Sequence, residues 1–239
     1  MKTSGRVLRC LKGGIAAAAL LATGMSAAHA ALTSFTSKAA FDLAISGFAG
    51  TQTLDFESVA AGTTFASGAG TGGLAFTYSI AGPSTLQVSS VFGTTSGSNY
   101  LGLDNPDTAF YLGDSFDITF SSALHAVGLY VITGSDAQAG DIQLSAAGGA
   151  VSNSATPDTL VSDGQAFYLG LVESDPLGFT SVTVSGLVSG GAFLAFTVDD
   201  ITTSPVSAIP EPEGWAMLLA GLGLLALRRR RSTTSKSSN

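Results

Sequence analysis

Four carboxylates near the two ends of the central part of the chain are the residues whose types and spacing most favour chemistry. Asp55 and Glu57 flank Phe56 in a segment expected to be the first strand of a sheet, and Asp199 and Asp200 end the expected last strand. First and last strands are often neighbours in jelly-roll sandwiches, so the four side chains are expected to meet. Buried together they would repel one another, and their pKa values would rise.

A bound calcium ion would relieve that repulsion, because Ca²⁺ takes about six to eight oxygen ligands. Basic side chains cannot do so, since Lys38 is the single basic residue between positions 31 and 209, where 15 acidic residues lie. We therefore hypothesise a structural Ca²⁺ ion held by some of Asp55, Glu57, Asp199 and Asp200. The alternative is that these residues face solvent or cap turns, and no D-x-D-x-D-G loop decides between the two.

Catalytic motifs are absent from the sequence. His125 is the only histidine after position 30, and neither a G-x-S-x-G nor an H-E-x-x-H pattern occurs. No arginine lies between 31 and 209, although enzymes acting on phosphate or carboxylate substrates usually clamp them with Arg or Lys. A glycosidase needs two carboxylates across a cleft, but 15 acidic residues make some such pair inevitable. We therefore assign no catalytic residue, and a glycan-active enzyme is the least favoured function.

Carbohydrate binding is the alternative to a passive surface role. Sugar sites stack pyranose rings on exposed aromatic side chains and bind the hydroxyls with Asp, Asn or Gln. The candidate aromatic residues are Tyr78, Tyr100, Tyr111, Tyr130 and Tyr168. Most of them fall at expected strand positions, where a core role is the competing interpretation. A further oxygen-rich segment, 100–107, is favoured as an Asx-type turn ahead of Pro106.

The elements that must position these residues form one all-β domain over 31–209. A short helix is expected from Lys38 to Ser46, with Phe41, Ala44 and Ile45 on its buried face. Alternation of apolar and polar residues, with Gly, Ser, Asn and Asp clusters between, then indicates about nine strands. They are Thr53–Phe56, Leu74–Ile80, Leu86–Phe92, Ser115–Phe120, His125–Thr133, Asp141–Ala146, Gln165–Val172, Ser181–Val184 and Phe193–Thr202. This pattern predicts a jelly-roll-like β-sandwich.

Residues 1–30 have the pattern of a secretory signal peptide. The basic residues Lys2, Arg6, Arg9 and Lys12 precede the short apolar run 15–21. Ala28 and Ala30 then form the small-x-small site that signal peptidase cleaves. Cys10 would leave with this segment, so the exported chain is expected to have no thiol chemistry.

The C-terminal segment 210–231 has three parts, of which the first is Pro210-Glu211-Pro212. A short apolar stretch, 215–227, is expected to form a transmembrane-type helix. The predicted anchor residues are Trp215, Leu218, Leu219, Leu222, Leu224, Leu225 and Leu227, followed by Arg228, Arg229, Arg230 and Arg231. The arginines are expected to remain cytoplasmic, which leaves the β domain outside, and 232–239 should be disordered.

This tripartite tail resembles the PEP-CTERM sorting signal of Gram-negative bacteria that make exopolysaccharide. Glu213 and Gly214 depart slightly from that pattern, in which small or hydroxyl residues are common. The resemblance implies recognition by an exosortase, which would cut near Pro210-Glu211-Pro212 and deliver the domain to the cell surface or the medium. The order of motifs in 31–203 also resembles, loosely, the β-sandwich domains that precede such tails. An unprocessed membrane anchor is the alternative.

These expectations combine into an exported, non-enzymatic protein of the cell surface or extracellular matrix. Its expected partners are signal peptidase, exosortase, exopolysaccharide and, transiently, the inner membrane. The segment 31–209 carries a net charge of −14, which excludes binding to nucleic acid through charge. A calcium-dependent, lectin-like module remains the alternative function.

Overall fold

The computed structural model describes residues 32–80, 83–134, 137–175, 177–187, 194–206 and 222. The chain divides into two compact units, Met1–Pro205 and Val206–Asn239. The predicted signal peptide and, apart from Leu222, the predicted sorting tail lie outside the described residues. Within the described ranges, no helix is long and apolar enough to cross a membrane.

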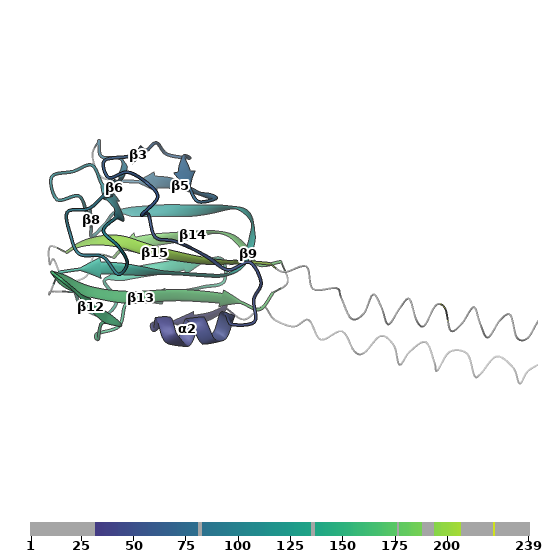
Figure 1. Cartoon of the computed structure of the whole chain (residues 1–239). Helices are drawn as coiled ribbons and strands as arrows, with labels where there is room; N and C mark the ends of the chain where they lie inside the picture. The colour runs from purple at the N-terminus through teal and green to yellow at the C-terminus, as the bar shows by residue number, and fades with distance from the viewer. Residues whose placement is uncertain are drawn as a thin grey trace, which may run out of the picture. The chain divides into compact units, whose positions relative to one another are not determined.

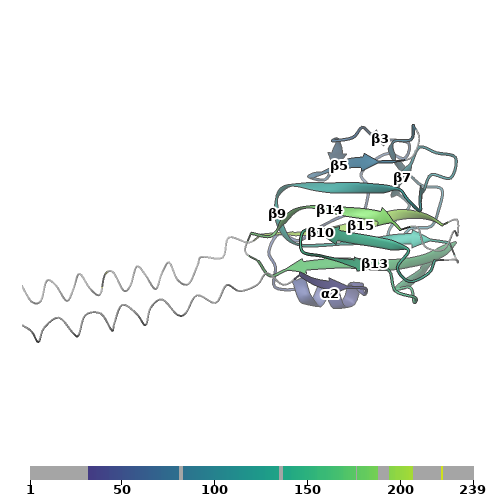
Figure 2. The ribbon, with the colours of Figure 1, turned by 180° about the vertical axis from the view of Figure 1, so that it is seen from behind.

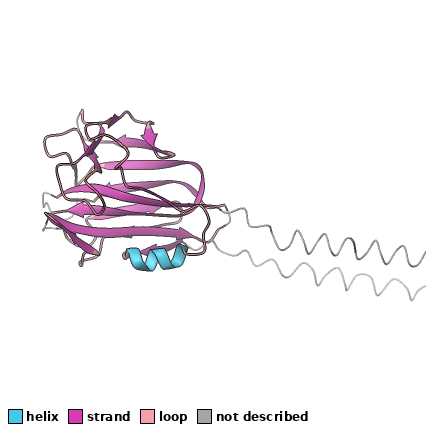
Figure 3. Cartoon of the chain, viewed as in Figure 1, coloured by secondary structure: helices cyan, strands magenta, loops and turns pink. Residues whose placement is uncertain are grey.

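The described residues of the first unit form antiparallel strands and one short helix (Figures 1 and 3). The helix α2 spans Lys38–Ile45. The strands are β1 (Leu32–Phe35), β2 (Gln52–Leu54), β3 (Thr64–Phe65), β4 (Gly70–Thr71), β5 (Leu74–Ser79), β6 (Leu86–Ser89), β7 (Tyr100–Leu103), β8 (Phe110–Tyr111), β9 (Ser115–Thr133), β10 (Ile142–Ala146), β11 (Gly149–Ser152), β12 (Thr159–Val161), β13 (Gly164–Glu173), β14 (Phe179–Gly186) and β15 (Ala195–Pro205). The prediction of an all-β domain with one N-terminal helix is confirmed.

The long strand β9 belongs to both halves of the unit. Its first part pairs with β5 and β14, and its second part, from Leu124 to Thr133, pairs with β13 and β15. The sequence predicts two strands here, but the chain passes from one half to the other through the exposed Ser121 and Ser122 without leaving the strand. Figure 2 shows β9 turning between the two groups of strands. Strands β10 and β11 extend the first half, and β1 and β12 extend the second.

One apolar core lies between the two halves. It includes Phe116 from the first part of β9 and Val131 from the second, both buried. Phe110 stacks on Phe116 and on Phe196, with ring centroids 4.8 and 5.2 Å apart. Alternate residues of β9 and β15 point into this core, and the residues between them point to the outer face of the second half.

The helix α2 covers one part of that outer face through Phe41. Its ring lies over Gly128 and Gly170, which are paired neighbours on β9 and β13. A Cβ atom at Gly170 would lie 2.6 Å from the Phe41 ring, so only glycine leaves room for it. Phe41 and Ile45 are buried as predicted, whereas Ala44 is exposed, because the eight-residue helix is too short and narrow to bury a third position.

The strand registers define two ends of the first unit. At the end that we call the terminal end, Leu32 pairs with Glu173 and Pro205 pairs with Leu124. At the opposite end, the distal end, Thr133 lies between Gln165 and Phe196. The described part of the first unit therefore begins and finishes at the same end.

Candidate functional site

The loop between β6 and β7 is held by carboxylates along the outer face of β15. We call residues 92–99 the clamped loop. The Asp199 carboxylate accepts hydrogen bonds from the Thr95 N–H at 3.0 Å, the Ser96 N–H at 3.2 Å and the Thr95 hydroxyl at 2.9 Å. The Asp200 carboxylate accepts hydrogen bonds from the hydroxyls of Thr95, at 2.8 Å, and Ser96, at 2.7 Å. Two consecutive acidic residues thus bind the same two loop residues.

A bulge in β15 makes this double contact possible. Successive side chains of a regular strand point to opposite faces, which would separate Asp199 from Asp200. The pairing of β15 with β9 shifts between Asp199 and Thr202, and Asp200 has a positive φ of 51°. The bulge turns the Asp200 side chain to the face that Asp199 already occupies.

The Asp199 carboxyl is poised to hold a proton. Burial raises its pKa to about 7, and the charge of Asp200 adds to this effect, although hydrogen bonds from Thr95, Asp200 and Ser96 oppose it. The Thr95 hydroxyl has a single hydrogen, yet it lies within hydrogen-bond distance of both carboxylates. When Asp199 is protonated, its O–H can donate to the Thr95 hydroxyl, and the Thr95 hydrogen can then be donated to Asp200.

Glu57 holds the clamped loop from its other side. One of its carboxylate oxygens accepts hydrogen bonds from the N–H groups of Ser98 and Asn99, each at 2.6 Å. These bonds, that from Asn99 most strongly, lower the pKa of Glu57. The Asp55 carboxylate accepts a bond from the Glu57 N–H at 3.1 Å and so closes the preceding turn.

The placement of Asp55 and Glu57 corrects one prediction. They lie in a turn after β2 and not on the first strand, because the strand ends at Leu54 and the buried Phe56 takes a positive φ of 60°. The predicted pairing of this strand with the last one is confirmed, since Leu54 pairs with Ile201. Three of the four predicted carboxylates, those of Glu57, Asp199 and Asp200, therefore converge on the clamped loop, whereas Asp55 bonds to the Glu57 backbone. The run of Thr, Ser and Gly at 94–98 is the sequence signal for this loop, because it offers hydroxyl and N–H donors, although such a cluster by itself indicates only a turn.

A metal site is not visible in this arrangement. In the described part of the chain, no group of three or more His, Cys, Asp or Glu side chains is placed to hold a metal ion. The Asp199 and Asp200 oxygens instead face N–H and hydroxyl donors of the loop. The Ca²⁺ hypothesis for Asp55, Glu57, Asp199 and Asp200 stays a prediction.

Gly97 is expected to be indispensable to the clamped loop. A Cβ atom there would lie 2.2 Å from the Glu57 carboxyl carbon, and its φ is +55°. We expect Gly97→Ala to displace Glu57 and to accelerate amide hydrogen exchange at Ser98 and Asn99. Gly68→Ala is the matched control, because Gly68 also has a positive φ, +90°, but its Cβ would meet nothing within 4 Å. Left-handed strain alone costs about 1 kcal/mol. Equal exchange rates in the two variants would contradict the clamp.

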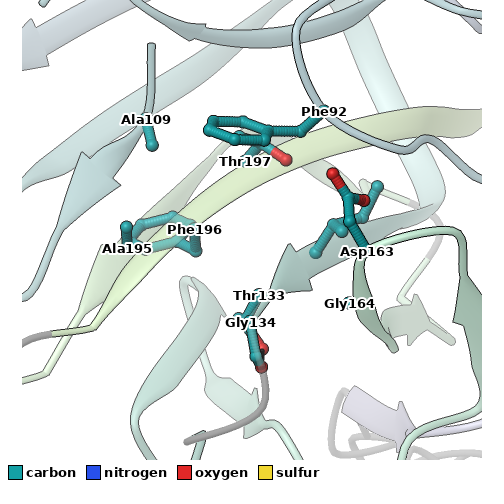
Figure 4. Close-up of a pocket in the computed structure, with 10 residues that line it drawn as sticks. Phe92, Ala109, Thr133, Gly134, Asp163, Gly164, Ala195, Phe196 and Thr197 are labelled. Atoms are coloured by element: carbon teal, nitrogen blue, oxygen red, sulfur yellow. Dashed lines mark hydrogen bonds between the residues drawn. The ribbon is translucent and has the colours of Figure 1, made fainter. Parts of the chain in front are cut away.

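A pocket of about 230 Å³ opens at the distal end beside the clamped loop (Figure 4). Its lining combines apolar walls with a few polar groups. The lining residues are Phe92, Ala109, Ile132, Thr133, Gly134, Asp163, Gly164, Ala195, Phe196 and Thr197. They come from β9, β13 and β15, from the loops that follow β9 and precede β13, and from the β6–β7 and β7–β8 loops.

The clamped loop supplies one wall of this pocket through Phe92. The Phe92 side chain is 41% exposed, and its ring stacks on buried Tyr100 with centroids 6.2 Å apart. The Asp163 carboxylate accepts a hydrogen bond from the Gly93 N–H at 2.8 Å. A Cβ atom at Gly93 would lie 2.5 Å from that carboxylate, so a glycine is needed for the close approach. The sequence does not predict this pocket, because Phe92 ends the expected strand Leu86–Phe92 and the expected sugar-stacking residues are tyrosines.

Those tyrosines are used elsewhere. Tyr100, Tyr130 and Tyr168 are buried. Burial and a hydrogen bond to Asp158 raise the pKa of Tyr130. Tyr111 is half-buried, and its hydroxyl bonds to Asp107, which raises the pKa of Tyr111 to about 12. The Tyr78 hydroxyl donates to the Phe65 carbonyl oxygen at 3.1 Å. The five tyrosines therefore serve packing and contacts within the domain.

The segment 100–107 and His125, the other candidates from the sequence, have structural contacts. In the segment 100–107, Tyr100–Leu103 forms β7, and the Asn105 side chain exchanges two hydrogen bonds with the Ala109 backbone, closing a turn. The His125 ring lies against Phe48 with centroids 5.8 Å apart, and its Nδ1 has no hydrogen-bond partner within the described ranges.

No protein-family model matches this chain, and no curated protein matches its sequence.

Proposed function

We propose that this chain is an exported, non-enzymatic protein of the Gram-negative cell surface or extracellular matrix, associated with exopolysaccharide. It is directed by the signal peptide 1–30 and sorted by an exosortase through 210–231. Before processing, the β domain lies outside the inner membrane and the arginines 228–231 lie in the cytoplasm. The observation that carries this proposal is the order of Pro210-Glu211-Pro212, an apolar stretch and four arginines.

The geometry of the first unit supports a tethered role. Leu32 and Pro205 both lie at the terminal end, which agrees with a leader that precedes the domain and an anchor that follows it. The pocket and Phe92 lie at the distal end, away from Leu32 and from Pro205, after which the expected anchor follows. A domain tethered in this way presents its loops to the surroundings. The jelly-roll-like topology and the transmembrane-type helix 215–227 are part of this proposal.

The use of the acidic residues supports a non-enzymatic role. The carboxylates of Glu57, Asp199 and Asp200 accept hydrogen bonds from the clamped loop and so hold that loop in position. The distal pocket favours carbohydrate binding as the second candidate function, because Phe92 offers an exposed ring beside a carboxylate. A glycan-active enzyme would need a second carboxylate across that pocket, and Asp163 is the only acidic residue of its described lining.

Alanine substitution of Pro210, Glu211 and Pro212 is expected to abolish C-terminal processing in a Gram-negative host that carries an exosortase. The unprocessed chain should then accumulate in the inner membrane, because the apolar stretch and arginines remain attached. Immunoblots of inner-membrane, outer-envelope and medium fractions measure this shift. The matched control replaces Ser232, Ser235 and Ser237 by alanine, which leaves all three parts of the tail intact.

Deletion of Arg228–Arg231 should disturb membrane orientation or retention in the same assay. Unchanged localisation of both the substituted and the deleted variant would contradict the sorting proposal.

A further inference from the structure

We propose that the distal pocket binds one uncharged pyranose ring, with its C–H face on Phe92 and its hydroxyls bonded to Thr197 and Asp163. The inference deepens the proposed association with exopolysaccharide and rests on it for the source of the sugar. It stands on three features of the pocket, which are an unpartnered buried hydroxyl, an exposed aromatic wall and the absence of positive charge.

The unpartnered hydroxyl belongs to Thr197. This side chain is 3% exposed, and no described residue forms a hydrogen bond with its Oγ1 atom. Burying a polar group without a partner costs stability, so such groups normally have a partner in the protein or in a ligand. Thr197 pairs with Ile132 on the outer face of the sheet, and both residues line the pocket. A ligand hydroxyl in the pocket would supply the missing partner.

The aromatic wall and the carboxylate are held at fixed positions beside that hydroxyl. Figure 4 shows the Phe92 ring beside Thr197, with the Asp163 carboxylate at another side of the pocket. Phe92 is oriented by stacking on Tyr100, with 23° between the ring planes. One Asp163 oxygen accepts the Gly93 N–H, and no residue in the described ranges donates to the other. An apolar ring face next to hydroxyl and carboxylate acceptors matches a pyranose, which has C–H groups on its faces and hydroxyls at its rim.

The charge of the pocket lining and the pocket volume restrict the class of ligand further. The described lining contains Asp163 and no basic residue, and Lys38 is engaged by Asp42 at 2.7 Å. An anionic sugar would therefore meet repulsion without a compensating cation. The volume of about 230 Å³ is below the usual range for drug-sized ligands, which restricts occupancy to about one ring.

Saturation-transfer NMR on the purified full chain tests the proposal. The probes are the methyl pyranosides of glucose, galactose, mannose and N-acetylglucosamine, with methyl glucuronide carrying a free carboxylate as the anion and benzyl alcohol as an apolar ring. We expect at least one neutral pyranoside to bind with a millimolar dissociation constant and glucuronide to bind at least tenfold more weakly. Stronger binding of benzyl alcohol than of every pyranoside would overturn the sugar assignment in favour of an apolar ligand, and no pyranoside binding would overturn it outright.

Thr197→Val locates the site. Valine has the shape of threonine without the hydroxyl, so the variant should be at least as stable as the parent and should bind the pyranoside about five- to tenfold more weakly. Thr64→Val is the matched control, because Thr64 is exposed on β3 and does not line the pocket. Phe92→Ala should weaken binding as well. An unchanged affinity for the pyranoside in a folded Thr197→Val chain would show that the sugar does not bind at the Thr197 hydroxyl.

The test separates this inference from the proposed function. Binding in solution needs no processing of the tail, and sorting of the chain needs no Thr197 hydroxyl. Correct sorting together with no pyranoside binding would reject the pocket alone. Pyranoside binding together with unaltered localisation of the tail variants would reject the sorting proposal alone.

Discussion

Phe41→Ala is expected to lower the free energy of unfolding by about 3–5 kcal/mol, the usual cost of removing a buried phenylalanine. Phe41 is fully buried and is the main contact of α2 with the sheet. Its ring packs edge-on against Phe35 at 5.9 Å and against Tyr168 at 5.3 Å. The neighbouring backbone at Gly128 and Gly170 carries no side chain that could fill the space left behind.

Chemical denaturation of the purified chain measures this loss. Leu43→Ala is the matched control, because Leu43 is two residues away on the same helix and 76% exposed. It should change the stability by no more than about 0.5 kcal/mol. Similar losses in the two variants would mean that α2 is not anchored through Phe41.

Stability is expected to fall between pH 4 and pH 7, and Asp199→Asn should remove most of this slope. The ordinary pKa of the Asp199 carboxyl is 3.8, and in the folded chain burial raises it to about 7. Over that range the folded chain retains a proton that the unfolded chain has released, so rising pH favours unfolding. The contribution is fully present below pH 4 and is lost by about pH 7, at up to about 1.4 kcal/mol per pH unit.

The difference between parent and variant isolates this carboxyl from the other titrating groups. Asp200 on the same strand and Tyr130 on β9 are the ionisable neighbours, and both remain in the variant. Asp42→Asn is the control, because Asp42 is exposed on α2 and pairs with Lys38. Denaturation at pH 5 and pH 8 gives the comparison. A slope unchanged by Asp199→Asn would show that Asp199 is already ionised at pH 5.

The same measurement decides the calcium hypothesis. A cation bound by Asp199 and Asp200 would replace the proton and recover the lost stability at pH 8. Millimolar Ca²⁺ that raises the stability of the parent at pH 8, but not that of Asp199→Asn, would support the site. No effect of Ca²⁺ or of chelator would reject it.

Periodicity predicts the all-β domain and most long strands, because alternation along a half-buried strand depends on its own residues. It misses the short strands β3, β4 and β12, because two or three residues are too few to show an alternation of apolar and polar side chains. It also divides β9 in two at the polar Ser121 and Ser122, since a strand that crosses between two halves of a sandwich loses its alternation there.

The acidic residues of the candidate site were predictable from the sequence, but their hydrogen bonds to the clamped loop were not. Composition shows that Asp199 and Asp200 lack basic partners, but a bulge with a positive φ at Asp200 leaves no signature in a single sequence. From the sequence, the apolar Phe92 could be a core residue just as well as an exposed residue at a pocket. Its exposure follows from the four carboxylates that hold its loop, Asp163, Asp199, Asp200 and Glu57. All but Glu57 lie 70 or more residues from the loop residues that they bind.

The course of β15 has a mechanical consequence. The strand runs from Ala195 and Thr197 at the pocket to Pro205 at the terminal end, with β9 alongside it for most of its length. Hydrogen bonds between antiparallel strands lie perpendicular to the strand axis. With the proposed ligand in the pocket and the proposed anchor beyond Pro205, a pull between the two would load these bonds together in shear and would not unzip them one at a time. The domain would then transmit tension along β15.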